Sequence, residues 1–284
     1  MTDAFFLPVG PAFPPVGPAF LPVGPAFHPV GPARFEPTEH VVGPWSPDFM
    51  HGGPPSALLA HEIAAQTAGQ SVPTDALMTR LTVEFLKPVP IGEVTVDVSL
   101  SRPGRRVAMA DAELAVDGET VLIARAWLSR LEPTPVPDTE TEPPPPPAEF
   151  RTFDSAGWNP GYLQAIEWAW VEGAFETPGP ATAWTRSRLP LVADRELAPL
   201  ERVLLVADSG SGLSAVANPR DLIFVNTELT VHLTRAPVGT DVWMRSQSFL
   251  DPQGVGLATT VLGDADGRIG VGNQSLFVAA TPGP

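Results

Sequence analysis

Cysteine is absent from this chain of 284 residues, and histidine and lysine are scarce. The missing thiols exclude disulfides, thiolate catalysis and cysteine-ligated zinc, and a total of five histidines argues against a His-rich metal site. A single lysine stands beside 16 arginines, and the formal net charge is −15. A chain this acidic lacks the clustered basic residues that nucleic acid binding requires. We therefore expect no metal, no organic cofactor and no nucleic acid partner.

Long apolar runs are missing as well. No stretch approaches the roughly 18 residues that a membrane-spanning helix needs, and the first residues lack the basic start and the cleavage site of a signal peptide. Hydrophobic residues nevertheless make up 43% of the chain, which is typical of a globular protein. We expect a cytoplasmic protein with two domains and no membrane span.

Proline, in contrast, is abundant, and one proline-rich tract lies near the start. The motif PVGPAF occurs at residues 8–13, 15–20 and 22–27, and a partial fourth copy follows at 29–33. Two prolines in each seven-residue repeat exclude a helix, because proline removes a backbone donor and clashes with the preceding turn. We interpret residues 1–34 as an irregular tract that arose by local expansion, and we expect folding to survive deletion of residues 8–28. The alternative is that the regularly spaced Phe residues dock on the fold.

A second proline-rich tract, residues 132–149, contains EPTPVPDTETEPPPPP. Proline and acidic residues without apolar periodicity are typical of a stiff, solvated linker. The tract separates residues 35–131 from residues 150–280. We therefore predict one domain on each side of it.

The two predicted domains repeat each other. Residues 81–96 (LTVEFLKPVPIGEVTV) return as residues 229–244 (LTVHLTRAPVGTDVWM), 148 positions later. Upstream, HGGPPSALLA at 51–60 has a fainter echo in SGSGLSAVAN at 209–218. A duplicated unit of this kind usually packs against its twin like a homodimer made in one chain.

Each half is predicted to contain a helix followed by antiparallel strands. In the first half, two glycines and two prolines suit a tight turn into a helix that runs to about Thr67. In the second half we expect helices near residues 162–170 and 212–217. Alternating apolar residues between Pro or Gly turns predict the strands. These are 78–86, 93–101, 107–116 and 120–131, and then 181–189, 222–233, 241–249, 256–262 and 270–279.

This order of elements matches an α+β double hotdog, in which each of two tandem domains wraps an antiparallel sheet around a helix. HGGPPSALLA, the strand end FLKP, and NTELTVHLTRAP with a later NQSLFV resemble the acyl-CoA thioesterase II family, whose members are double hotdogs. The resemblance covers roughly residues 35–280. It implies hydrolysis of a fatty or other apolar acyl-CoA by activated water, which agrees with the missing cysteine and GxSxG motif. By analogy, hotdog sheets that join edge to edge imply a homodimer or higher homo-oligomer.

Comparing the two halves predicts where the chemistry lies, because a site can be polar in one half only. Three positions gain a carboxylate, a hydroxyl or an amide in the second half: Glu228, Ser248 and Gln274, opposite Arg80, Leu100 and Arg125. The resembled family uses an Asp, a Thr or Ser, and a Gln of its second hotdog to hold and activate one water. The resemblance thus assigns Glu228 as the base and Gln274 and Ser248 as the groups that orient the water.

The carbonyl oxygen of a thioester also needs hydrogen-bond donors. Backbone amides at a glycine-led helix start can supply them, and the candidates for this substrate-binding role are Gly52, Gly53, Gly210 and Ser211. A second hotdog lineage, resembling phenylacetate-pathway thioesterases, places its carboxylate nine residues after the His of HGG. Here that position is Ala60, and Glu62 faces another direction on the helix.

Two alternatives remain at this point. The chain is a hotdog that binds acyl-CoA or acyl-carrier protein without turnover if Glu228, one methylene longer than the family's Asp, misplaces the base. It is a hydratase or dehydratase if an Asp–His pair forms, and the candidate pair is Asp208 and His232.

Overall fold

The computed structural model describes residues 3–10, 32–137, 139, 142–154, 159–217 and 222–281. Its strands form one 14-stranded sheet in the order β1-β2-β4-β5-β6-β3-β11-β14-β13-β12-β9-β8-β7, and β10 pairs with β14 beside β11. The first half supplies β1 (Phe6–Pro8), β2 (Ala33–Pro37), β3 (Ala76–Phe85), β4 (Val94–Arg102), β5 (Val107–Val116) and β6 (Glu119–Arg130). The second half supplies β7 (Arg151–Thr152), β8 (Ile166–Ala174), β9 (Thr177–Ser187), β10 (Leu222–Asn226), β11 (Glu228–Leu233), β12 (Asp241–Asp251), β13 (Val255–Asp264) and β14 (Gly267–Ala280).

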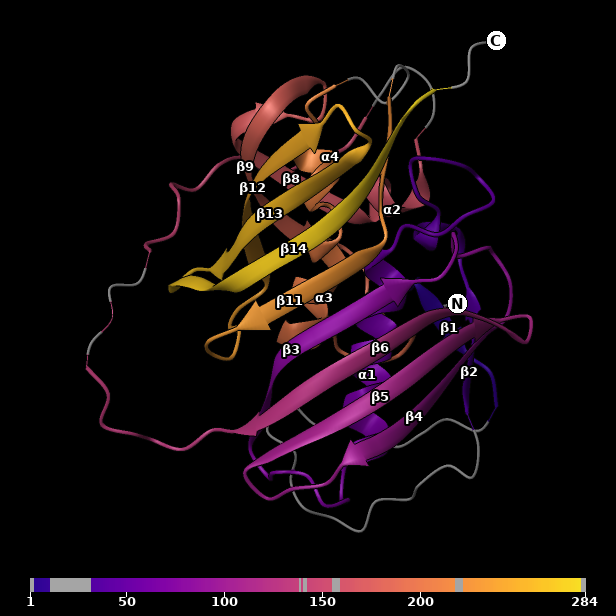
Figure 1. The fold of residues 1–284 in the computed structure, drawn as a ribbon, viewed down its shortest axis with the longest axis vertical. Coiled ribbons are helices and arrows are strands. Elements are labelled where there is room, and N and C mark those ends of the chain that lie inside the picture. Colours follow the sequence, from indigo (N-terminus) through magenta and orange to yellow (C-terminus); the bar gives the residue numbers. More distant parts are fainter. Residues whose placement is uncertain are drawn as a thin grey trace.

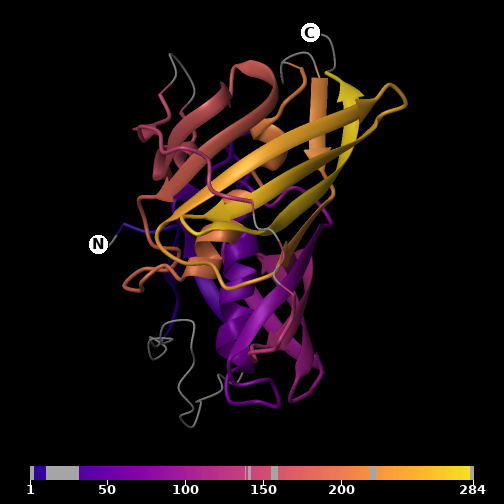
Figure 2. The same ribbon diagram turned by 90° about the vertical axis from the view of Figure 1, so that its left-hand side faces the viewer.

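The helices lie on one side of this sheet. They are the 3-10 turn η1 (Glu39–Val41), α1 (Gly53–Thr67), α2 (Gly161–Ala165), α3 (Pro199–Ala207) and α4 (Gly210–Leu213). Figure 1 views the central strands from outside, with α1 and α3 behind them, and Figure 2 shows the sheet curving around α1. The predicted α+β double hotdog is confirmed. No helix in the described part of the chain is long and apolar enough to cross a membrane.

Two central strands, β3 and β11, join the halves into one sheet. They pair antiparallel with Leu81 opposite Val231 and Thr82 opposite Thr230, and the Thr230 and Thr82 hydroxyls lie in hydrogen-bond contact at 3.2 Å. Thr82 and Thr230 are also 148 residues apart, which is the period of the repeat. The pseudo-twofold axis that relates the two lobes therefore passes through this pair of threonines.

The two long helices pack antiparallel behind the strands. The main chain of Gly53, at the start of α1, is so close to the carbonyl of Leu205, near the end of α3, that a side chain at position 53 would clash. At the other end, His61 of α1 bonds Glu201 of α3 at 2.7 Å, and both residues are buried. The apolar faces of both helices belong to the same hydrophobic core. Each helix start thus abuts the other lobe, which places interlobe contacts at both ends.

Element by element, α1 and β3 to β6 of the first half fold as predicted, whereas β1, β2 and η1 were not predicted. The second half departs from prediction at its helices, and its predicted strand 222–233 divides into β10 and β11. The main helix is α3, which the sequence analysis did not predict, although Pro199 at its first position and Glu201 two residues on are a helix-start signature. The predicted helix at 212–217 is only the short α4 that follows it. Most of the predicted helix at 162–170 is strand β8, because Trp168 and Ala169 bury their side chains on opposite faces of the sheet.

The proline-rich tract at residues 1–34 is not irregular throughout. Phe5 and Phe6 are fully buried, β1 pairs with β2, and the main chain of both residues bonds residues 190–193, so this part of the predicted tract 1–34 is built into the fold between the two halves. Residues 11–31, which hold most of the PVGPAF repeats, lie outside the described residues. The linker contacts the second lobe: Glu142 pairs with Arg245 and accepts the N–H of Arg268 at 2.9 Å, and Trp184 donates to the carbonyl of Pro146 at 3.3 Å.

Candidate active site

A buried carboxylate, Asp208, lies at the end of α3. Asp208 as a whole is 8% exposed. The side-chain amide of Asn226, the last residue of β10, donates to Oδ1 at 2.9 Å, and the amide of Gln274 in β14 donates to the same oxygen at 3.1 Å. The second oxygen, Oδ2, points towards the first lobe. The carboxylate thus has one oxygen held by two amides and one directed at the interlobe boundary.

Gln274 has every polar atom of its side chain engaged. Its Nε2 donates both to Asp208 Oδ1 and to the Asp208 carbonyl at 2.9 Å, while its Oε1 accepts the N–H of Ser211 at 2.9 Å. This pattern fixes which end of the amide is nitrogen. It also ties the end of α3 to the start of α4 and to β14, so Gln274 sets where the carboxylate lies.

The first lobe closes the site with His51 and Gly52. His51 Nδ1 lies 3.6 Å from Asp208 Oδ2. A Cβ on Gly52 would lie 2.6 Å from the same oxygen, so any larger residue there would collide with the carboxylate. Tyr162 of α2 stacks on the His51 ring, with centroids 3.6 Å apart and planes 5° from parallel. The site is therefore built from both lobes and from α2.

Burial sets the protonation of the two ionisable groups. It raises the pKa of Asp208 to about 6, and hydrogen bonds from Asn226, Gln274 and the Gly52 N–H offset part of that rise. Burial also lowers the pKa of His51 to about 3. At neutral pH the carboxylate is ionised but unusually basic, and the imidazole beside it is neutral.

The repeat explains why this site occurs once. A constant offset of 148 residues places Met78 opposite Asn226 and Ala126 opposite Gln274, and the strand registers agree: Ala126 pairs with Ala110, and Gln274 pairs with Ala258. The first lobe is apolar at both positions. The idea that the site is polar in one lobe only is thus supported, but with Asn226 in place of Glu228.

The structure does not bring Glu228 to Gln274. The Glu228 carboxylate accepts from the N–H of Ser275 at 2.8 Å and from the Thr230 hydroxyl at 2.8 Å, on the outer face of the sheet. Gln274 precedes Ser275 and points inward, since neighbouring strand residues face opposite sides. The prediction that these two side chains meet is therefore wrong, and Asp208 stands where Glu228 was expected. Arg125, which we placed opposite Gln274, is outward for the same reason: a slip of one residue exchanges the faces.

Ser248 faces inward but lies apart from the carboxylate. It pairs with Ala258, which pairs with Gln274, so two strand spacings of roughly 5 Å each separate Ser248 from Gln274. Its hydroxyl bonds that of Ser214 at 2.8 Å, beneath α4. The geometry gives Ser248 no contact with Asp208.

The backbone N–H groups that we predicted to bind the thioester oxygen mostly donate hydrogen bonds within the protein. The Gly52 N–H bonds Asp208, and the Gly53 N–H donates to His51 Nδ1 at 3.0 Å. The Ser211 N–H donates to Gln274, and Gly210 packs against Thr260 so closely that a side chain would clash. These four residues border the site and orient its side chains.

The proposed Asp208–His232 pair does not form, because His232 is exposed on the outer face. Its place beside Asp208 is taken by His51. Asp208 is absent from the predicted site because the echo of 51–60 was placed at 209–218, beyond the position that the 148-residue offset gives. Asn226 lies opposite Met78 at that offset and was not among the three positions compared. The start of α3 and the unbroken 148-residue offset are the signals that locate them.

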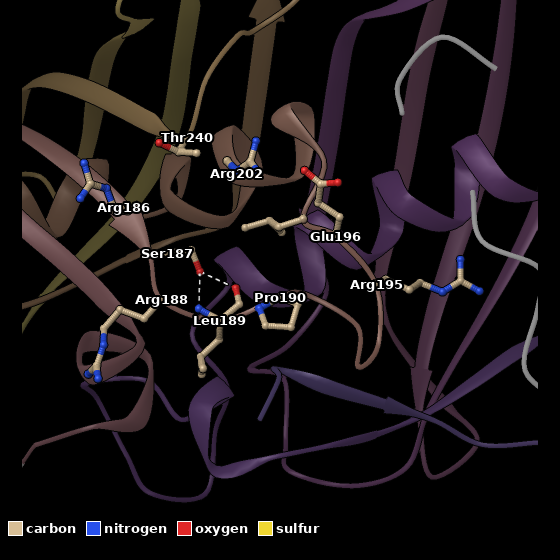
Figure 3. A pocket seen from close by; sticks show the side chains of 10 residues that line it. Arg186, Ser187, Arg188, Leu189, Pro190, Arg195, Glu196, Arg202 and Thr240 are labelled. Carbon is tan, nitrogen blue, oxygen red and sulfur yellow. Dashed lines mark hydrogen bonds between the residues drawn. The ribbon is translucent and has the colours of Figure 1, made fainter. Parts of the chain in front are cut away.

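A hollow of about 510 Å³ lies near the start of α3, away from Asp208 (Figure 3). Arginines dominate its lining, but Arg186 is paired with Asp241, and Figure 3 shows Arg188 and Arg195 directed away from each other. It has no carboxylate held by amides. Among the described residues, no group of three or more His, Asp or Glu side chains is arranged to hold a metal ion.

Sequence comparisons agree with this architecture. The model of the acyl-CoA thioesterase N-terminal domain matches residues 41–129, and that of the acyl-CoA thioesterase C-terminal domain matches residues 133–278. The two matches meet at the linker. No curated protein matches the chain significantly.

Solved structures share the fold at low identity. A hot dog fold protein of unknown function from Alicyclobacillus acidocaldarius superposes with a TM-score of 0.71 at 15% identity, covering 90% of this chain and 96% of that protein. The tesB protein of Mycobacterium avium subs paratuberculosis superposes with a TM-score of 0.64 at 14% identity, covering 89% of this chain and 94% of that protein. Acyl-CoA thioesterase II TesB2 from Mycobacterium marinum superposes with a TM-score of 0.62 at 13% identity, covering 87% of this chain and 98% of that protein.

Proposed function

Because the chain belongs to the acyl-CoA thioesterase family, we propose that it hydrolyses an acyl-CoA thioester at Asp208 with water as the nucleophile. The observation that carries the proposal is the buried carboxylate whose Oδ1 is held by Asn226 and Gln274 while Oδ2 faces Gly52 and His51. A general base needs an oxygen that is fixed in place, and its pKa should lie near the working pH. Asp208 meets both conditions.

In the proposed reaction, a water bound at Oδ2 loses a proton to Asp208 as its oxygen attacks the thioester carbonyl carbon. The tetrahedral intermediate then breaks its C–S bond. The sulfur leaves as a thiolate, which takes the proton back from Asp208 and becomes the thiol of CoA. The other product is the carboxylic acid. No bond to the protein forms at any step.

Asn226 and Gln274 serve this reaction by holding Oδ1, so that Oδ2 is the oxygen free to accept a proton. Gly52 lets the main chain approach Oδ2, since a side chain at this position would collide with the carboxylate and with the ring of Phe85. The neutral His51 places no positive charge beside the carboxylate. Its ring instead helps to exclude bulk water, which keeps the base strong.

A hydratase would need a histidine that donates a proton beside Asp208. The nearest, His51, accepts the Gly53 N–H through Nδ1, and burial lowers its pKa. That arrangement disfavours proton donation. Hydrolysis therefore fits the geometry better than hydration of a double bond.

Thiol release from a series of acyl-CoA substrates tests the proposal, with wild type, D208N and E228Q compared under identical conditions. We expect wild type and E228Q to turn over at similar rates and D208N to lose about 10³ in kcat/KM. A wild-type protein that binds acyl-CoA without releasing thiol would identify a binding protein instead. Activity in D208N as high as in wild type would remove the proposed base.

A further inference from the structure

Tyr162 is the only tyrosine in the chain, and its side chain is fully buried between the lobes. It comes from α2, outside the strands and helices that carry Asp208, Asn226 and Gln274. Its ring stacks on His51, and its hydroxyl reaches α3. The reaction described above gives it no part.

The hydroxyl of Tyr162 starts a chain of hydrogen bonds whose direction is fixed at both ends. It donates to the Leu205 carbonyl at 3.0 Å, because a carbonyl only accepts. The Ser209 hydroxyl lies 2.8 Å from the Tyr162 oxygen, and the phenol proton is already used, so Ser209 is the donor there. Ser209 in turn lies 3.4 Å from His51 Nε2 and has only an acceptor left to offer it.

The other side of the imidazole gives the same answer. The Gly53 N–H donates to Nδ1 at 3.0 Å, so Nδ1 carries a lone pair and Nε2 carries the proton. The two ends of the network therefore select one tautomer of His51. In that tautomer the unprotonated Nδ1 lies 3.6 Å from Asp208 Oδ2.

We propose that Tyr162 is a positioning residue for Asp208: through Ser209 it holds His51 in the tautomer that turns an unprotonated nitrogen towards the carboxylate. This inference rests on the proposed function. A lone pair facing Oδ2 repels negative charge, so it favours the protonated carboxyl that forms when the base takes a proton from water. An Nδ1–H in the same place would donate to Oδ2 and weaken the base.

Other ionisable groups do not obscure this effect. Of the described ionisable side chains, His51 at 3.6 Å and Tyr162 behind it are the ones that the interactions place against Asp208. Burial raises the pKa of Tyr162, which keeps its proton at all working pH values. Asn226 and Gln274, on the remaining sides, do not titrate.

The decisive variant is Y162F, which keeps the stacked ring and removes the hydroxyl. Ser209 is then free to donate to His51 Nε2, and the Nδ1–H tautomer gains population. We expect the acidic limb of the kcat/KM profile to move about one unit to lower pH, and kcat at neutral pH to fall. S209A, which interrupts the same chain one link later, should move the limb in the same direction.

The control is T185V, which removes another buried hydroxyl that donates to a main-chain carbonyl, the Thr185 bond to Val242 at 2.8 Å. It should lose stability without moving the pH profile. An unchanged profile in Y162F would overturn the inference, even if stability or kcat fell, because a purely structural role leaves the base unaltered.

Nitrogen-15 NMR of His51 tests the inference without using activity. Wild type should show a protonated Nε2 and an unprotonated Nδ1, and Y162F should show a rise in the Nδ1–H form. Carbon-13 titration of the Asp208 carboxyl should show its pKa falling in Y162F. A wild-type His51 protonated on Nδ1 would contradict the inference, whereas a lack of thiol release alone would contradict only the proposed function.

Discussion

Gln274 binds Asp208 twice, through the carboxylate Oδ1 at 3.1 Å and through the main-chain carbonyl at 2.9 Å. A single side chain thus fixes both the direction of the catalytic candidate and the end of the helix that carries it. Since Ala126 occupies the equivalent place in the first lobe, this double contact belongs to the second lobe alone.

Replacing Asp208 with Asn should lower kcat/KM by about 10³, within the range for loss of a general base. The amide is nearly isosteric and still fills the site, so the fold should persist by circular dichroism. E228Q is the matched control, because Glu228 is a carboxylate on the outer face of the same lobe. A larger loss in E228Q than in D208N would reverse the assignment.

The reaction should depend on one ionisation near pH 6. Burial raises the pKa of Asp208 to about 6, so kcat/KM should be flat above that value and fall tenfold per unit below it. The measurement is a pH–rate profile between pH 4.5 and 8.5 with a single acyl-CoA, a window chosen to extend about two units either side of the limb. A profile with no acidic limb would show that Asp208 does not titrate in catalysis.

The free energy of unfolding should also depend on the ionisation of Asp208, but it should fall as pH rises, whereas activity rises. The folded pKa of Asp208 lies above its ordinary 3.8, so between about pH 4 and 6 the folded state retains a proton that the unfolded state has lost. Stability is therefore lost as pH rises through this window, by about 3 kcal/mol in all. Asparagine does not titrate, so the stability of D208N relative to wild type, measured by urea unfolding, should rise over the same pH range. His51 makes stability change with pH in the opposite direction in both proteins, so its contribution cancels when the two free energies of unfolding are subtracted.

Replacing Gln274 with Ala should lower kcat by about 10²–10³, comparable to removing a key positioning donor. Asp208 Oδ1 and the Ser211 N–H both lose partners, so some stability should also be lost. S248A is the control, since Ser248 faces the same interior but contacts Ser214. Equal losses of kcat in the two variants would show that the effect comes from the packing of the lobe.

The interlobe bond between His61 and Glu201 should matter for stability. H61A removes the partner of Glu201 Oε1 and leaves only the Ala198 N–H on the other oxygen, which should cost about 2–3 kcal/mol in the free energy of unfolding. H232A removes an exposed histidine and should be neutral. Urea unfolding at pH 7 compares them, and an H61A protein as stable as H232A would mean that the bond is replaced by solvent.

Local pattern was sufficient for the first lobe. Strands β3 to β6 begin and end within three residues of their predicted bounds, because each alternates apolar and polar residues between Pro or Gly turns. The same reasoning failed for Trp168 in β8, where apolar side chains lie on both faces and imitate a buried helix. It failed again at α3, whose start signal at Pro199 and Glu201 was not used, so the helix was predicted at 212–217 instead.

The amino-acid sequence alone established the duplication and the hotdog class, and it pointed to Gln274 as a candidate site residue. The duplication follows from comparing residues 148 apart, the hotdog class from the order of the predicted elements, and the choice of Gln274 from the family resemblance. Only the tertiary structure decided which carboxylate Gln274 meets. Glu228 lies one strand away but on the outer face, whereas Asp208 arrives from a helix 66 residues earlier. The alternation of faces along a strand excluded Glu228, and the packing of α3 against β14 brought in Asp208; neither can be read from sequence separation.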